Sequence, residues 1–184
     1  MKTKVISAPT ELPVTLDEAK AFYRVIGADE DADIVRSISA ATEKAEQITN
    51  RQLKMATYEG YLDAFVSSVK LPKPPFAAMT KVEYIDTDGE TQSWTDYCID
   101  DVVEPAVMYF DSFPPDVKTE GVNNVIATFT SGYENVPEAI KSWILIYGLT
   151  LFENRENLVE GVSVSDVKSE YYSHLLDSFR IIPI

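Results

Sequence analysis

The apolar residues between positions 137 and 155 recur three and four positions apart, which is the spacing of a helix. They form two sets on different faces: Ile140, Trp143, Ile144, Tyr147 and Leu151 on one, and Leu145, Leu149 and Phe152 on the other. A helix that is apolar on two faces has to be covered on both. We therefore predict a central helix, with its first face packed on a helix at 31–49. We expect its second face to meet a C-terminal helix or an adjacent subunit.

Three further segments have helical patterns, at about 15–26, 30–49 and 166–179. The first begins with Thr15 and Glu18, which have the spacing of a capping box, and Gly27 follows its end. The acidic residues at 29–33 begin the second helix, where negative charge is stabilised by the positive end of the helix dipole. Together with the central helix, these segments predict a small helical bundle.

Between residues 54 and 133 the pattern changes to the period of two that is typical of β-strands. The clearest strand candidates are 56–62, 80–85, 91–97, 106–110 and 123–130. Asp88 and Gly89 lie between the second and third of these, and this pair favours a tight hairpin turn. The proline-rich segment at 71–76 fits an extended bend rather than a central strand.

These patterns predict an α+β fold in which an antiparallel β-rich lobe is inserted into a helical bundle. We assign 1–53 to an N-terminal arm and two helices, with the arm at 1–14. We assign 54–133 to the β-rich insert. The remainder, 134–184, then contains the central helix, the C-terminal helix and a tail that complete the helical core.

The composition is that of a folded, acidic protein, with 45% hydrophobic residues and a net charge of −14. An open surface that grips nucleic acid needs clusters of Lys and Arg, so this charge argues against one. The first residues have no long apolar stretch, which argues against a signal peptide. The apolar run at 143–152 is about half of the roughly 20 residues that a membrane span needs. A single cysteine excludes an internal disulfide and favours a reducing compartment.

The sequence offers few groups for catalysis or metal binding. The only histidine, His174, has no nucleophile or orienting partner nearby in the sequence. We expect the only cysteine, Cys98, to lie in a strand with its side chain in the protein core. One Cys and one His cannot form a tetrahedral zinc site. The carboxylates Asp86, Asp88 and Asp96 could serve a hydrolase, although turn and surface roles explain them more simply. We therefore predict no catalytic residues, no metal and no cofactor.

Several short motifs occur in an order that resembles one known family. They are LDEAK at 16–20, ATEKAE at 41–46, TNRQL at 49–53, LPKPP at 71–75, VPEAIK at 136–141, FENRE at 152–156 and LLDSFR at 175–180. This order and spacing resembles the head–tail connector (adaptor) proteins of tailed bacteriophages, in the subgroup with a β insert between its helices. The NRQL segment departs from the commoner Gly-Arg form.

The resemblance implies a virion structural protein without enzymatic activity. Such adaptors form a ring of about twelve subunits beneath the portal protein. They extend the channel through which double-stranded DNA passes, and they join the head to the next neck or tail protein. The protein would then reside in the host cytoplasm before assembly and in the neck of the virion afterwards, without a membrane partner.

The apolar residues that we expect at subunit or partner interfaces lie in the second half of the chain. They are Trp143, Leu145, Leu149, Phe152, Phe179, Ile181, Ile182 and Ile184. We expect residues 181–184 to dock on the portal. Two alternatives stay open: another neck protein, such as a stopper or tail-completion protein, and an acidic inhibitor that mimics DNA. The second would need carboxylates in a regular row, whereas those of this chain are scattered.

Overall fold

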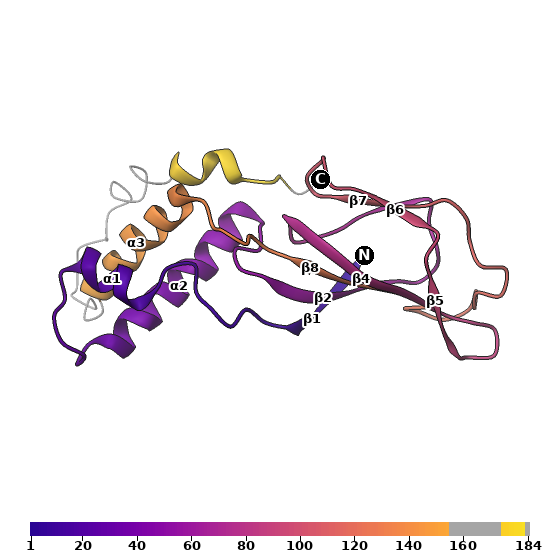
Figure 1. The fold of residues 1–184 in the computed structure, drawn as a ribbon, viewed down its shortest axis with the longest axis horizontal. Helices are drawn as coiled ribbons and strands as arrows, with labels where there is room; N and C mark the ends of the chain where they lie inside the picture. The colour runs from indigo at the N-terminus through magenta and orange to yellow at the C-terminus, as the bar shows by residue number, and fades with distance from the viewer. Residues whose placement is uncertain (155–173, 183–184) are drawn as a thin grey trace, which may run out of the picture. The chain divides into compact units, whose positions relative to one another are not determined.

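The computed structural model describes residues 1–154 and 174–182 (Figure 1). The chain divides into two compact units. We call the first, Met1–Pro9 and Lys54–Glu134, the β unit, and the second, Thr10–Leu53 and Asn135–Ile184, the helical unit. The α+β fold class predicted from the sequence is confirmed. Within the described residues, no helix is both long and apolar enough for a membrane crossing.

The β unit contains two antiparallel sheets. The larger has the order β1-β2-β8-β4-β5, formed by β1 (Lys2–Ser7), β2 (Ala56–Leu62), β8 (Val125–Ser131), β4 (Phe76–Ile85) and β5 (Thr91–Trp94). The smaller has the order β3-β7-β6, formed by β3 (Ser68–Lys70), β7 (Val107–Phe110) and β6 (Tyr97–Asp100). As predicted, Asp88 and Gly89 lie in the connection between β4 and β5, and Gly89 has a φ of 89°.

Alternation along the strands builds one core from both sheets. Tyr58 and Phe129 of the larger sheet stack with ring centroids 5.9 Å apart, and Met108 of the smaller sheet belongs to the same buried cluster. Phe65, between β2 and β3, contacts Phe110 edge-on, with the two ring centroids 5.0 Å apart. The insert therefore has its own hydrophobic core.

The described residues of the helical unit form α1 (Leu16–Tyr23), α2 (Asp31–Thr49), α3 (Glu138–Glu153) and a short 3-10 helix, η1 (His174–Phe179). The predicted capping box of α1 is present, because the Glu18 amide donates to Thr15 Oγ1 at 3.2 Å and the Thr15 amide donates to Glu18 Oε2 at 2.7 Å. The helix ends at Tyr23 rather than near 26, since Arg24 adopts a left-handed conformation with a φ of 59°.

The N-terminal arm differs from the prediction. Residues 2–7 form β1, which pairs with β2, so 1–9 belongs to the β unit rather than to the helical part. The prolines at 9 and 13 suggested an extended arm; both follow the strand and leave it free to pair with β2. The predicted C-terminal helix at 166–179 lies mostly outside the described residues, and its last six residues form η1.

Candidate interaction surfaces

One face of α3 forms the core of the helical unit. Ile140 and Ile144 are fully buried, and Trp143 is 2% exposed and stacks on Tyr147 at 4.8 Å. Leu145 and Leu149, on the other face, are half-buried. Of the predicted interface residues on this helix, Trp143 therefore lies inside its own unit, while Leu145 and Leu149 retain exposed apolar surface.

Gly148 brings α1 close to α3. A Cβ atom at this position would lie 2.4 Å from the hydroxyl oxygen of Tyr23, so only glycine leaves room for the ring where it stands. The Tyr23 ring also stacks on Phe152 with centroids 5.6 Å apart. Burial raises the pKa of the Tyr23 phenol. Phe152, predicted as an interface residue, thus holds α1 against the last turn of α3.

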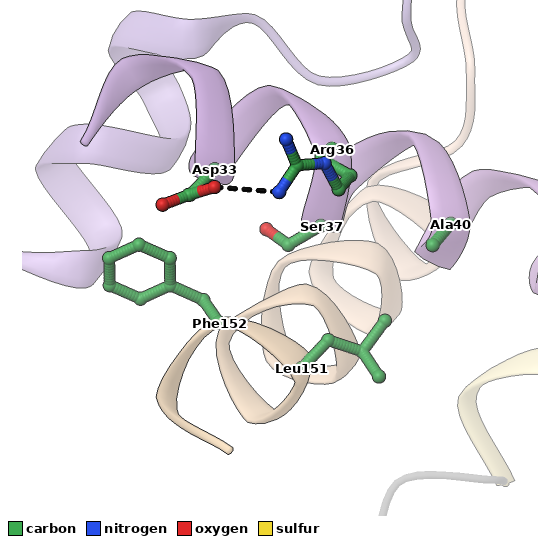
Figure 2. Close-up of a pocket in the computed structure, with 6 residues that line it drawn as sticks. All are labelled: Asp33, Arg36, Ser37, Ala40, Leu151 and Phe152. Atoms are coloured by element: carbon green, nitrogen blue, oxygen red, sulfur yellow. Dashed lines mark hydrogen bonds and ion pairs between the residues drawn. The ribbon is translucent and has the colours of Figure 1, made fainter. Parts of the chain in front are cut away.

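A groove runs between α2 and the last turn of α3, with a volume of about 200 Å³ (Figure 2). Its lining comprises Asp33, Arg36, Ser37 and Ala40 from α2, and Leu151 and Phe152 from α3. Arg36 donates to the Asp33 carboxylate at 2.8 Å, and Figure 2 shows this pair along one side of the groove. The groove is thus apolar along α3 and charged along α2.

The loop between α1 and α2 presents Ile26, whose side chain is 98% exposed. Lys20 fixes the loop from inside, because its ammonium group donates to the carbonyl of Gly27 and to Asp31 Oδ1, the latter at 2.6 Å. The amide of Val25 donates to the Lys20 carbonyl at 3.1 Å. These bonds hold the loop on both sides of an isoleucine that the described parts of the chain leave uncovered.

The C-terminal segment is attached to the end of α2. The Ile181 amide donates to the Thr49 carbonyl at 3.0 Å, and Asn50 Nδ2 donates to the Ile181 carbonyl at 2.8 Å. Arg51 Nε donates to the Phe179 carbonyl at 2.6 Å. Ile181 is therefore held by its own chain, whereas Ile182 is 81% exposed and Ile184 lies outside the described residues.

Residues 82–117 of the β unit contain ten acidic and no basic residues. Asp86 is buried and accepts hydrogen bonds from Gln92 Nε2 at 2.8 Å and from the amides of Glu90 and Asp88 at 2.9 and 3.0 Å. The Gln92 side chain, followed by the Glu90 amide, lowers the pKa of the Asp86 carboxyl. The Asp86 carboxylate therefore stabilises the hairpin turn, which is the simpler of the two roles considered for it.

The other groups considered for chemistry have simple surroundings. Asp88 is exposed, and Asp96 accepts a hydrogen bond from the Ser112 hydroxyl. His174 is exposed, with Nδ1 at 3.0 Å from Asp177 Oδ2. Cys98 is exposed on β6, so the expectation that it lies in the core was wrong. An edge strand of four residues, such as β6, has too few alternating positions for the sequence to show which of its faces is buried. In the described part of the chain, no three His, Cys, Asp or Glu side chains are grouped to hold a metal ion.

No protein-family model matches the chain, and no curated protein matches its sequence. Solved structures do match. A chain in the neck of an empty gene transfer agent (GTA) particle, computed with C6 symmetry, is 18% identical with a TM-score of 0.78, and the match covers 100% of this chain and 97% of that one. A chain in the virion of the native particle has a TM-score of 0.76 at the same identity and coverage.

A third match, in the neck of the native particle computed with C12 symmetry, has a TM-score of 0.71, again at 18% identity with the same coverage. The chain therefore has, over its full length, the fold of these chains. Two of these three structural neighbours come from particle necks, which is the kind of assembly that the sequence motifs indicated.

Proposed function

We propose that the protein is a structural component of the neck of a tailed-phage-like particle, and specifically a ring-forming head–tail adaptor. The observation that carries the proposal is the full-length likeness to chains from GTA particles, two of them described as necks. The motif order in the sequence points to the same class independently. In this role the adaptor ring binds beneath the portal, extends the DNA channel and joins the head to the next neck or tail protein.

Charge supports the channel role. The chain carries a net charge of −14, and residues 82–117 contribute ten acidic residues without a basic one. A lumen lined by such a surface repels phosphates, so that DNA passes without being bound. The same net negative charge argues against a protein that binds DNA tightly.

Subunit contacts in a ring require two different surfaces on each copy. The apolar surface left on Leu145 and Leu149 is a candidate for one of them, and Phe179 and Ile182 extend the candidates to the C-terminal segment. Symmetries C6 and C12 in the related necks fit a ring of about twelve copies. Within this proposal, Ile182 rather than Ile181 is the residue free to contact the portal.

A stopper, which would bind next in the neck, is the second candidate, because likeness to neck chains does not by itself fix the position in the neck. The two roles are separated by electron microscopy of particles made without the protein, combined with binding of the purified protein to isolated portal rings. An adaptor binds the portal directly, and its loss leaves filled heads that neither retain DNA nor join tails.

Binding only to a preformed portal–adaptor complex would favour the stopper. Particles with normal necks in the absence of the protein would exclude both roles. Re-expression of the wild-type chain, which should restore tailed particles, is the matched control for this experiment.

A further inference from the structure

We propose that neighbouring copies in the ring join by insertion of the Ile26 loop (residues 24–30) of one copy into the α2–α3 groove of the next. This inference rests on the proposed function, because it names the contact that would build the ring. Both surfaces belong to the helical unit and can be argued from described residues alone.

The Ile26 loop has the properties of a preformed anchor. Its leading side chain is 98% exposed, and the two bonds from Lys20 to Gly27 and Asp31 hold the loop in one shape. An apolar residue on a rigid tip loses little conformational freedom when it binds, which makes it an efficient contact. A single exposed apolar residue is ordinary, but one that is fixed in place and almost fully exposed is less so.

The groove provides the complementary cavity. Leu151, Phe152 and Ala40 give it an apolar lining, and about 200 Å³ accommodates an aliphatic side chain. Phe152 is already held by its stacking on Tyr23, so the lining is preformed as well. Since Ile26 is exposed, it does not fill the groove of its own chain.

Each of the two surfaces has both positive and negative side chains beside it, so that opposite charges can face one another. Arg24 and Asp29 flank Ile26 on the loop, and both are exposed. The groove carries Asp33 and Arg36 on its α2 side, and Glu153 directly follows its Phe152 wall. In the inserted arrangement, Arg24 would meet the acidic groups and Asp29 would meet Arg36. Such pairs orient a contact and exclude wrong registers.

The contact is heterologous, because the loop and the groove are different surfaces. After two copies join, one loop and one groove remain unused, so further copies add until the ring closes. This behaviour fits the cyclic symmetry of the related necks. A second copy of the chain is therefore the occupant to which we assign the groove.

Cysteine cross-linking of the full-length chain tests this contact. In a Cys98→Ser background, the double variant Ile26→Cys with Ala40→Cys should form disulfide-linked multimers up to the ring size under mild oxidation, alone or on portal rings. Each single-cysteine variant should remain monomeric on a denaturing gel. Rings that form in the double variant without a cross-link would overturn the contact and leave the proposed function standing.

Mixing two defective variants gives a sharper test. Ile26→Asp removes the loop contact, and Ala40→Arg fills the groove beside Asp33. Each alone should reduce ring formation at least tenfold, and a mixture of both should stop at dimers, because only one working contact exists between them. The matched control is Val102→Asp, which places the same charge on a residue that is 91% exposed in the β unit and should assemble normally.

Ile26 and Ala40 are both exposed, so unfolding temperatures should stay unchanged in these variants. Normal rings from Ile26→Asp, or a mixture that yields complete rings, would overturn the proposal. A wild-type chain that forms no ring with or without the portal would overturn both this contact and the proposed adaptor function.

Discussion

Each unit of the protein has a glycine where another part of the chain comes close, but the neighbour differs. In the β unit, a Cβ on Gly132 would lie 2.5 Å from the carbonyl carbon and oxygen of Lys54. In the helical unit, a Cβ on Gly148 would lie 2.4 Å from the hydroxyl at the end of the Tyr23 side chain. Backbone held by the bridge between Lys54 and Tyr133 cannot easily move aside, whereas a side chain can. We infer that Gly132 tolerates an added methyl group less than Gly148 does.

The largest effect is expected for Gly132→Ala. Gly132 has a φ of 129°, which a residue with a side chain rarely adopts, and the added methyl group would collide with the backbone of Lys54. The free energy of unfolding should fall by about 3 kcal/mol or more. Chemical denaturation followed by far-UV circular dichroism measures it.

Gly89→Ala is the control for that experiment. Gly89 also has a positive φ, but no atom lies within 4 Å of an added Cβ. It should lose only about 1 kcal/mol, from backbone strain alone. Equal losses in the two variants would show that the contact with Lys54 is unimportant.

An intermediate effect is expected for Gly148→Ala. Moving Tyr23 aside costs packing energy, while alanine favours the helix more than glycine does, so the net loss should be about 1 kcal/mol. The second substitution Tyr23→Phe removes the hydroxyl and should recover most of this loss. A double-mutant cycle from thermal unfolding measures the coupling. Absence of coupling would contradict the close approach of α1 to α3.

A smaller effect at neutral pH is expected for Asp86→Asn, which keeps one carbonyl oxygen as an acceptor in the hairpin. The folded-state pKa of Asp86 is below its ordinary value of about 4, so ionised Asp86 stabilises the folded state above that pH. This contribution is lost as the pH falls through the folded-state pKa. The difference in unfolding temperature between wild type and variant should therefore be largest near pH 7 and shrink toward pH 3.

Glu18→Gln is the counterpart in the helical unit. The Thr15 amide and hydroxyl also lower the pKa of Glu18, but this carboxylate is exposed. Solvent screens exposed charges, so its pH dependence should be weaker than that of Asp86. A stronger dependence for Glu18 would reverse the comparison between the units.

The sequence predicted elements whose pattern is long and regular. The period of α2 and α3 and the alternation of β2 and β8 were clear over several turns or residues, and the structure confirms these elements. The strands β3 and β6, with three and four residues, are too short to show a period. The strand β1 was missed because its partner β2 lies far away in the sequence.

The candidate interaction surfaces depend on tertiary structure and were only partly predictable. The two apolar faces of α3 were evident, but that Trp143 is buried and Leu149 half-buried follows from packing. The groove combines Asp33 of α2 with Leu151 of α3, and no local pattern connects such distant residues. Ile26 precedes a glycine in a short loop, and nothing in this local sequence indicated that the Ile26 side chain would be exposed.

The bridge between Lys54 and Tyr133 joins the two ends of the β-rich insert at its base. The bridge keeps the two ends of the insert close together, whatever the length of the insert. The entropy cost of closing the insert therefore does not reduce the stability of the helices. The connections between the strands of the insert could thus vary in length while α2 and α3 keep their pairing. In this sense the bridge separates the length of the insert from the packing of the helices.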